Sequence, residues 1–411
     1  MESRRFLRSV SMVLTTAAAV AMLATVASAA GTPQVIYSLA GDNDGEYTDT
    51  DLVIDGAGNL FGTSVQGGTF GGGTVFELSP SGNGWTHTVL YNFTGGADGG
   101  EPYKGVTLDS QGNLYGTAVT GGGGSCEGGC GVAYKLTHVG GTWTQSVIHT
   151  FTGGNDGSGP GAGLTLDKHG NVYGMTPTGG ANGLGVIFRL QQQASGEWKI
   201  KVLHTFNGDD GATGSAGRLL LRSGTFYGAA TVGGANGQGT IFSLKHIPGQ
   251  WQFKTLYSFK GQPDAGFPYG GLTFDQAGNL YGTTYYDGAN DFGAVYQLSP
   301  QPDGSWAEKV LYSFKGGRDG MGSISNLVLS KKGALYGTTS EGGSSCSCGT
   351  IFKVKVDALG NWTEKVIYRF TGVPDAGFAY NGMVADAAGN LYGATVHGGT
   401  NNDGAIYKFT P

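Results

Sequence analysis

Hydrophobic and polar positions alternate along this chain in short runs that recur at regular intervals. In one representative stretch, strand-like runs cover residues 106–109, 113–118, 132–136 and 143–151 and are rich in Tyr, Val, Leu and Thr. Gly, Asn and Asp stand between such runs, as they do at turns. Beyond residue 30 no apolar stripe of helical period is found. The pattern therefore predicts an all-β protein.

One core of the form Gly-Asn-Leu-Tyr-Gly-Thr, with small variations, recurs every 54 to 58 residues. Its seven copies begin at Gly58, Gly112, Gly170, Gly224, Gly278, Gly333 and Gly389. The Gly-Asn step predicts a tight turn between the first two strands of each unit. Units of four antiparallel strands in series are typical of β-propeller blades. Seven copies predict seven blades.

The two ends of the repeat region complement each other. Residues 35–39 resemble the end of a fourth strand at 89–93, whereas 405–409 resemble a third strand and no fourth strand follows. The N-terminal strand is therefore predicted to complete the last blade, which removes two exposed sheet edges. We predict a single domain over residues 30–411, a closed seven-bladed β-propeller with four antiparallel strands per blade.

The six Trp residues occupy one fixed place in the repeat. Each stands eight residues before an aromatic residue at the end of a fourth strand, as Trp143 does before Phe151. So regular a position predicts packing between layers of the structure. A sugar-stacking platform is the alternative.

Residues 1–29 differ in character from the rest of the chain. Arg4, Arg5 and Arg8 precede an apolar stretch at 10–26, and Ala27-Ser28-Ala29 follows. This is the pattern of a secretory signal peptide, so a secreted or periplasmic protein is predicted, with the general secretory and twin-arginine routes both open. The remaining chain has 21 basic and 29 acidic residues. Its acidic balance argues against nucleic-acid partners, and we expect a monomer without a transmembrane segment.

The repeat resembles a known family. The phrase Gly-Asn-Leu-Tyr-Gly-Thr, followed by Gly-Gly and then Gly-Thr-Val-Phe, is similar to the GloVer tandem repeat of exported bacterial proteins and, more distantly, to NHL-type repeats. The resemblance covers nearly the whole chain after residue 30. It implies a propeller and placement outside the cytoplasm, and it implies no activity.

Propeller topology places the long Gly-rich loops on one face, where a ligand is expected. An Asp recurs at one position in the long loop before each first strand, fourteen residues before the Gly of the core: Asp44, Asp98, Asp156, Asp210, Asp264, Asp319 and Asp375. Such an Asp commonly holds its turn through backbone N–H groups. The alternative is a ring of carboxylates that attracts Ca²⁺, to which Asp42 would add a further ligand. No other cofactor is expected.

Departures from the repeat on this face mark a candidate site. The copies are most different in blade five, where Tyr285, Tyr286 and Asp287 replace Gly residues. The candidate ligand-binding residues are Glu101, Tyr103, Tyr269, Tyr285, Asp287, Arg318 and Tyr380. If the protein is an enzyme, a Tyr or His base with a cation would suit a polysaccharide lyase, and the catalytic candidates are Tyr286, His397, Arg218 and Lys104. A glycosidase would need two carboxylates, for which Glu101, Glu341 and Asp287 are available.

The four Cys residues fall in the same loop of two different blades. Cys126 and Cys130 lie in blade two, and Cys346 and Cys348 in blade six. In an exported protein, two local disulfides are the natural interpretation.

These observations favour an exported binding module that recognises a polysaccharide or cell-envelope partner at the pore face. The ligand envisaged is a polar polysaccharide, such as one that contains uronic acids. An extracellular carbohydrate-active enzyme, a lyase or a glycosidase, is the first alternative. A scaffold for another protein is the second.

Overall fold

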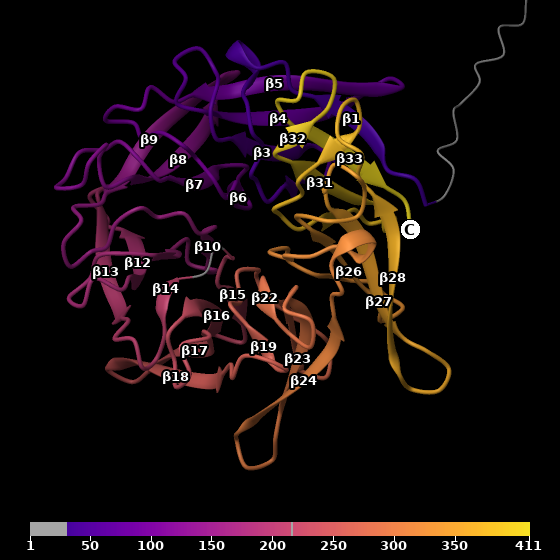
Figure 1. Cartoon of the computed structure of the whole chain (residues 1–411). Coiled ribbons are helices and arrows are strands. Elements are labelled where there is room, and N and C mark those ends of the chain that lie inside the picture. The colour runs from indigo at the N-terminus through magenta and orange to yellow at the C-terminus, as the bar shows by residue number, and fades with distance from the viewer. Residues whose placement is uncertain (1–30, 215–216) are drawn as a thin grey trace, which may run out of the picture.

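The computed structural model describes residues 31–214 and 217–411, which form a ring of seven antiparallel β-sheets (Figure 1). The predicted signal peptide lies outside the described residues. Helical structure within them is confined to two 3₁₀ turns, η1 (Asp42–Asp44) and η2 (Gly317–Asp319). In this part of the chain no helix has the length and apolar character to cross a membrane. The all-β, seven-bladed architecture is thus confirmed.

Each blade has four strands, numbered outward from the centre of the ring. Blade 1 contains β2 (Val53–Ile54), β3 (Leu60–Ser64), β4 (Thr74–Ser81) and β5 (Gly84–Asn92). Blade 2 contains β6 (Val106–Leu108), β7 (Leu114–Ala118), β8 (Val132–Val139) and β9 (Thr142–Thr150). Blade 3 contains β10 (Thr165–Leu166), β11 (Val172–Thr176), β12 (Val186–Gln192) and β13 (Trp198–Thr205).

The remaining blades repeat this order. Blade 4 contains β15 (Leu220–Arg222), β16 (Thr225–Val232), β17 (Thr240–Ile247) and β18 (Gln250–Ser258), with β14 (Ala212–Gly214) also paired to β16. Blade 5 contains β20 (Thr273–Phe274), β21 (Leu280–Thr283), β23 (Ala294–Pro300) and β24 (Trp306–Ser313). Blade 6 contains β25 (Val328–Leu329), β26 (Leu335–Thr339), β27 (Thr350–Val356) and β28 (Trp362–Arg369).

Blade 7 closes the ring with both ends of the described chain. It contains β30 (Val384–Ala385), β31 (Leu391–Thr395), β33 (Ala405–Phe409) and, as its outermost strand, β1 (Gln34–Ser38). The register of β1 on β33 pairs Val35 with Tyr407 and Ser38 with Ala405. The N-terminal strand therefore satisfies an edge that would otherwise be open, as the sequence predicts.

Burial along a blade follows from the position of each strand. In β7 all five residues are buried, because this strand lies between neighbouring blades and has no solvent face. In β9 exposed and half-buried residues alternate over the first five positions, as expected of a strand at the outer edge. The predicted strand positions agree with these, except that β8 extends three residues further than its apolar run because its end projects beyond the core.

The second glycine of each core is required by packing. Gly116 in β7 lies opposite Tyr134 in β8, and a Cβ atom at Gly116 would overlap the Tyr134 hydroxyl. The same replacement would overlap an aromatic ring in every other blade, for example Phe188 at Gly174. A buried aromatic residue on the third strand thus fills the space that this glycine leaves, which explains why both recur in every copy.

The Trp residues lie between blades. Trp198 in blade 3 packs edge-on against Tyr115 in blade 2, with ring centroids 6.3 Å apart. Trp251 meets Tyr173, Trp306 meets Tyr227, Trp362 meets Tyr281 and Trp85 meets Tyr392 in the same way, at 5.9 to 6.4 Å. These contacts support the predicted packing role, because each joins a fourth strand to the second strand of the preceding blade.

In every blade a short pairing joins the loop before the first strand to the loop that follows the second strand. It forms small sheets in blades 5 and 7, where β19 (Ala265–Gly266) pairs with β22 (Tyr286–Asp287) and β29 (Ala376–Gly377) pairs with β32 (His397–Gly398). In blade 4 it is the pairing of β14 with β16, and in the remaining blades it is a single bridge: Glu46–Gln66, Gly100–Thr120, Ser158–Thr178 and Met321–Glu341. The strand pattern of the sequence does not predict this pairing, although it recurs in all seven blades.

Candidate functional site

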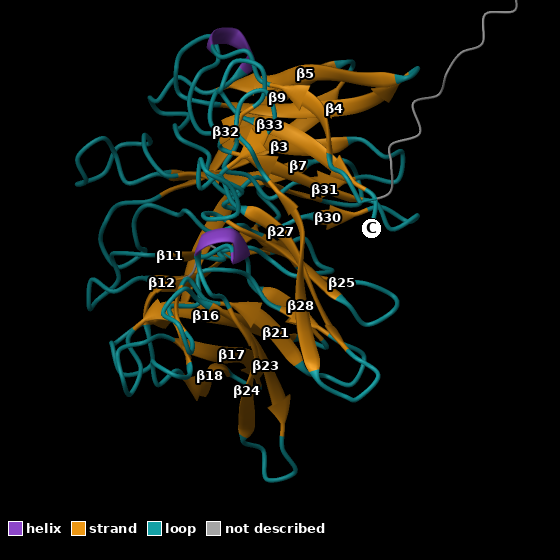
Figure 2. Cartoon of the chain, turned by 45° about the vertical axis from the view of Figure 1, so that its right-hand side comes forward, coloured by secondary structure: helices purple, strands orange, loops and turns teal. Residues whose placement is uncertain are grey.

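The loops of the propeller divide between two faces. The loops before first strands and those between second and third strands, such as 93–105 and 119–131, lie on what we call the loop face. The tight turns between the other strands, such as 109–113 and 140–141, lie on the opposite turn face. Figure 2 shows the loops on both sides of the ring, with the 3₁₀ turns η1 and η2 marked in purple.

The seven repeated Asp residues hold the loop face together. Asp98 accepts hydrogen bonds from Tyr91 Oη in β5 and from the Thr94 backbone N–H, each at 2.9 Å. Five other carboxylates bond in the same way to a Tyr or His seven residues earlier in the chain: Asp44 to Tyr37, Asp156 to His149, Asp264 to Tyr257, Asp319 to Tyr312 and Asp375 to Tyr368. Asp210 instead pairs with His204, six residues earlier, whose Nε2 lies 2.9 Å from Asp210 Oδ2. Since the partner lies on the outermost strand of its blade, each Asp ties a loop to the outer part of the ring.

The electrostatics of these carboxylates follow from their donors. Burial alone opposes ionisation of Asp44, but bonds from His87 at 2.8 Å, from Tyr37 and from the Ala40 N–H outweigh it, and the pKa of Asp44 lies below its ordinary value. The pKa of Asp98 is lowered for similar reasons. Nothing in the described ranges places three or more His, Cys, Asp or Glu side chains as a metal-binding group. Asp42 lies in η1 and is exposed.

Near the axis of the ring, polar side chains from different blades meet. Lys104 Nζ in blade 2 donates to Asp49 Oδ1 and to Asn381 Oδ1, each at 2.7 Å, and Asn381 Nδ2 donates to Asp49 Oδ1 at 2.7 Å. Asn326 Nδ2 in blade 6 donates to Asp51 Oδ2 at 3.0 Å. Blade 1 lies between blades 2 and 7, and blade 7 between blades 6 and 1, so these bonds cross the inner ends of whole blades. We call these five residues the central polar cluster.

Arg218 makes a similar cross-ring contact. Its guanidinium donates to Thr107 Oγ1 in β6 at 3.4 Å, although blade 3 stands between the two. Lys104 is buried, with 8% of its surface exposed. The two cations proposed as catalytic therefore lie in contacts that hold the inner ends of the blades together.

Beside the central polar cluster, tyrosines and carboxylates form an arc on the loop face. Tyr285 Oη donates to Glu341 Oε1 at 3.1 Å, and the Tyr285 ring meets Tyr269 edge-on at 5.7 Å. Tyr380 lies within electrostatic range of Glu341 and Asp49. Tyr103 lies within the same range of Asp49 and Glu101. We call the set Tyr269, Tyr285, Glu341, Tyr380, Asp49 and Tyr103 the tyrosine arc, and it extends from blade 5 through blades 6, 7 and 1 to blade 2.

The four phenols of the arc are held in their neutral form. Burial, followed by the charge and hydrogen bond of Glu341, raises the pKa of Tyr285 to about 12. Burial also raises the pKa of Tyr103, Tyr269 and Tyr380, and neighbouring carboxylates or Tyr286 add to the effect. At neutral pH each phenol can donate one hydrogen bond and accept others. The arc thus alternates neutral hydroxyls with carboxylate acceptors.

His397 and Tyr286 lie in separate aromatic contacts. The His397 ring meets Tyr47 at 5.2 Å and Phe378 at 5.4 Å, both edge-on. Tyr286 is 49% exposed and packs against Tyr285 and Phe267. The four catalytic candidates therefore have different surroundings: Tyr286 and His397 lie in the small sheets β19–β22 and β29–β32, and Lys104 and Arg218 at the inner ends of the blades.

The other three predicted ligand-binding residues lie outside the arc. Asp287 is buried, and its Oδ2 has no hydrogen-bond partner among the described residues. Burial, with the charges of Asp291 and Asp264, raises its pKa. Arg318 is exposed in η2, where its carbonyl accepts a bond from Arg369. Glu101 lies next to the arc, at a position with a distinctive backbone.

That position, three residues after the repeated Asp, has a left-handed backbone in all seven loops. Five of the residues there are not glycine, namely Tyr47, Glu101, Thr213, Phe267 and Phe378, with φ between 53° and 61°. The Glu101 N–H donates to the Gly72 carbonyl of blade 1, and its own carbonyl accepts from Val119 of blade 2. Phe267 and Phe378 bind the preceding blade in the same way. The strained residue is thus a backbone clamp between adjacent blades.

Two members of the site, Asp49 and Asp51, were not among the residues predicted from the sequence. Both precede the first strand of blade 1, where the other copies have mainly Tyr or Gly at the first position and Gly at the second. Because the other copies have no acidic residue at these two positions, Asp49 and Asp51 could have been identified from the sequence as departures from the repeat. The Asp that every copy shares drew the prediction to a different position of the same loop.

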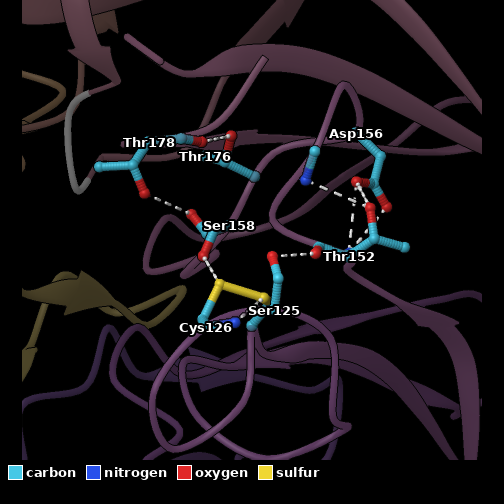
Figure 3. Close-up of a disulfide and its surroundings, with 9 residues drawn as sticks. Ser125, Cys126, Thr152, Asp156, Ser158, Thr176 and Thr178 are labelled. Carbon is cyan, nitrogen blue, oxygen red and sulfur yellow. Dashed lines mark hydrogen bonds between the residues drawn. A yellow bond between two sulfur atoms is a disulfide. The ribbon is translucent and has the colours of Figure 1, made fainter.

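Both cysteine pairs are joined within their loops. Figure 3 shows the Cys126–Cys130 disulfide, whose Cys126 Sγ lies 3.0 Å from Ser158 Oγ in the loop that follows β9. Ser125 Oγ donates to the Thr152 carbonyl at 3.0 Å. The Cys346–Cys348 disulfide has an equivalent place, with Ser344 bonded to the Phe370 carbonyl. Each bridge thus stabilises a loop at a junction between blades.

Solved structures with similar backbones share the propeller architecture and little sequence. A protein from Lactobacillus plantarum has a TM-score of 0.50 and 14% identity, over 82% of this chain and 87% of its own. A hypothetical selenium-binding protein from Sulfolobus tokodaii has a TM-score of 0.51 and 10% identity, over 76% of each chain. An ancestral GH74 enzyme has a TM-score of 0.53 and 10% identity, over 89% of this chain and 48% of its own. At such identities the likeness concerns the fold alone.

No curated protein matches the chain in sequence. A family model does match, and its description is the Gloeobacter/Verrucomicrobia repeat. It matches twice, over residues 123–307 and 248–411. Because these segments together cover more than half of the chain and contain the repeat core quoted above, the resemblance is confirmed, and the protein belongs to the Gloeobacter/Verrucomicrobia repeat family.

Proposed function

We propose that this protein is an exported binding module that recognises a polysaccharide with its loop face. The observation that carries the proposal is the tyrosine arc, in which four neutral phenols alternate with the carboxylates of Glu341 and Asp49. Sugars present hydroxyl groups that both donate and accept hydrogen bonds. Phenols and carboxylates complement them, and aromatic rings pack against the apolar faces of sugar rings.

The negative charge of the arc limits the class of polysaccharide that it can bind. Among the described residues, one ion pair involves a carboxylate of the arc, that of Asp49 with Lys104, and Lys104 also binds Asn381. A uronic acid placed there would meet the negative charges of Glu341 and Asp49, and Lys104 is already engaged. A neutral polysaccharide therefore fits this face better than the uronic acids considered at first.

Export is the second part of the proposal and rests on the N-terminal sequence and the repeat family. The first 29 residues have the pattern of a signal peptide, and the repeat family is consistent with a bacterial extracellular protein. A polysaccharide of the cell envelope or surroundings would then be within reach of the loop face. We propose that the protein acts there as a monomer.

Glycoside hydrolysis is the second candidate. The ancestral GH74 enzyme shares the propeller architecture, and the arc has the carboxylates that a glycosidase needs. Against a glycosidase, Glu341 already accepts a hydrogen bond from Tyr285. Against a lyase, its two candidate bases, His397 and Tyr286, lie in separate aromatic contacts. A scaffold for another protein is the third candidate and predicts no polysaccharide binding.

One experiment separates the three. The purified protein, with residues 1–29 removed, is passed over a size-exclusion column with each of a panel of neutral plant, algal and microbial polysaccharides. We expect co-elution with one polymer of unchanged length. A shortened polymer would indicate the enzyme, and no co-elution with any polymer would contradict both carbohydrate proposals and favour the scaffold.

The assignment to the arc is tested with matched Tyr variants. Tyr285→Phe and Tyr380→Phe each remove one hydroxyl from the arc, whereas Tyr227→Phe removes one from β16, where the ring packs on Phe274 and Trp306. We expect the first two to weaken co-elution and the third to leave it unchanged. An equal loss in all three would show that the arc is not the site.

A further inference from the structure

Two connected clefts lie on the turn face, away from the tyrosine arc. One, of about 870 Å³, lies between blades 2 and 3, and the other, of about 760 Å³, lies between blades 3 and 4. Residues Asp167–His169 and Asn171 line both clefts, so the two meet at the turn between β10 and β11. The two clefts thus lie on either side of this turn of blade 3, and we call them together the basic groove.

Free cations line the basic groove. Lys135 and Lys168 line the first cleft, and Lys168 and Arg189 line the second. Within residues 31–214 and 217–411, none of these three forms an ion pair with a carboxylate. Lys135 lies over the Tyr115 ring at 5.4 Å, and Arg189 donates to Gln191. Their positive charges are therefore available to a ligand.

The two carboxylates in the groove are occupied by the protein. Asp109 accepts bonds from Asn113 Nδ2 at 2.8 Å, from two backbone N–H groups and from the Tyr115 hydroxyl. Asp167 has the same arrangement with Asn171 and Tyr173. Both acids hold their turns, and these donors lower the pKa of each carboxyl, so both stay ionised. The groove therefore presents three cations against two carboxylates whose oxygens already accept bonds from the protein, and its balance of charge is positive.

The charge distribution along the chain agrees with this picture. Residues 31–103 contain nine Asp or Glu and no Lys or Arg, whereas residues 135–254 contain nine Lys or Arg and five Asp or Glu. The first segment contains β1 of blade 7 and the whole of blade 1, and the second extends from β8 through blades 3 and 4. The part of the ring that contains the basic groove is therefore richer in positive charge than blade 1, and residues 308–369 have a similar balance of nine Lys or Arg and five Asp or Glu.

Aromatic and amide groups accompany the cations. The first cleft is lined by Trp198 and Tyr115, with Gln192 and Gln193 at the β12–β13 turn. The second is lined by Trp251. Indole and phenol rings offer surfaces for the C–H faces of sugars, and the amides can bond to hydroxyl groups. Lysine and arginine bind carboxylate or sulfate groups.

We propose that the basic groove is a second binding site, for a polysaccharide that bears carboxylate or sulfate groups. Such a polymer combines the anionic groups, the hydroxyls and the apolar ring faces for which the groove has partners. The protein would then bind a neutral polymer on one face and an anionic polymer on the other, and this second site does not depend on the first.

Polygalacturonate is the probe for the carboxylated class. Its affinity for the purified protein is measured by isothermal titration calorimetry beside dextran of matched length and single-stranded DNA. We expect polygalacturonate to bind more tightly than either, and to weaken as NaCl rises from about 0.05 M to about 0.5 M, because salt screens the lysines. Binding no tighter than that of dextran would overturn the proposal.

Charge-reversal variants locate the site. Lys135→Glu with Lys168→Glu is expected to weaken polygalacturonate binding by about tenfold or more. The control is Lys309→Glu with Lys365→Glu, which makes the same change in net charge at exposed positions of β24 and β28. An equal loss in the control would mean that overall charge, and not the groove, attracts the polymer.

Two further comparisons complete the test. Single-stranded DNA that binds as tightly as polygalacturonate would overturn the assignment to a polysaccharide, since DNA shares the charge but not the sugar hydroxyls. Tyr285→Phe on the loop face is expected to leave polygalacturonate binding unchanged. A loss in that variant would place the anionic polymer on the tyrosine arc instead.

Discussion

Lys104 Nζ lies 2.7 Å from Asn381 Oδ1 although 277 residues and the whole of blade 1 separate them. The same ammonium group binds Asp49 at the same distance, so one side chain joins blades 2, 1 and 7 at the inner end of the ring. These are the blades on either side of the closure made by β1. A buried cation is therefore part of what holds the first and last parts of the repeat in place.

Lys104→Ala is expected to destabilise the protein by about 3 kcal/mol, because it leaves Asp49 without its cation and Asn381 without a donor. Urea unfolding followed by Trp fluorescence measures the change. Lys309→Ala, at an exposed position of β24, should change stability by less than about 0.5 kcal/mol. Equal effects of the two substitutions would contradict the role assigned to Lys104.

Stability is also expected to depend on pH through two glutamates between blades. Burial, then the charge of Asp264, raises the pKa of Glu308 in β24 to about 8. Burial, then the charge of Asp319, raises that of Glu364 in β28 to about 8. An unfolded Glu releases its proton near pH 4.3. Between about pH 4.5 and 8 the folded protein therefore holds protons that the unfolded chain has lost, and stability should fall as the pH rises through this window.

Thermal unfolding at about pH 7 and pH 8.5 measures the fall in Tm, above the range in which His149 and His204, whose pKa is lowered by burial, take up protons on unfolding. Glu308→Gln with Glu364→Gln cannot ionise, so the Tm of this variant should change less between the two conditions. Turn acids such as Asp98, whose pKa is lowered, remain ionised throughout the window and do not alter the sign. A Tm of the natural protein that rises with pH would contradict the prediction.

The repeat explains why the fold is predictable from the sequence and the site is not. Gly116, Tyr134 and Trp198 represent positions kept in most or all copies, because every blade packs against the next in the same way. Closure by β1 can be read from the same repetition. The contacts of Lys104 with Asn381 depend on how distant loops converge at the axis, which neither local pattern nor repeat spacing specifies.

The basic groove was missed for a related reason. The long Gly-rich loops in the sequence all lie on the loop face, whereas the groove is lined by short turns and by strand residues such as Arg189 and Lys135. Of the residues chosen from the loops, Tyr103, Tyr269, Tyr285 and Tyr380 belong to the tyrosine arc, because all four lie next to the first or second strands of their blades, which are the strands nearest the centre of the ring.

The repeated Asp residues should act on stability and not through Ca²⁺. Asp98→Ala removes the acceptor for Tyr91 and for the Thr94 N–H, and is expected to cost about 1 to 2 kcal/mol. The Thr94 hydroxyl also donates to Asp98, so Tyr91→Phe removes one of three bonds and should cost less. Because the carboxylate is already bonded to protein donors, we expect the Tm in about 5 mM Ca²⁺ to equal the Tm in the presence of a chelator. A rise in Tm with Ca²⁺ would instead support the carboxylate ring as a metal site.

The left-handed backbone at Thr213 is expected to lower the stability of the protein. Thr213 in β14 has φ of 53°, a conformation that is unfavourable for a β-branched side chain, while its N–H donates to the Leu184 carbonyl of blade 3 at 3.0 Å. Thr213→Gly keeps that bond and relieves the strain, so we expect the protein to gain about 0.5 to 1 kcal/mol of stability despite the greater freedom of glycine in the unfolded chain. Thr213→Val keeps the β-branch and the strain and should give no gain. If urea unfolding shows Thr213→Gly to be less stable than the natural protein, the Thr213 side chain contributes more through its contacts than its backbone costs.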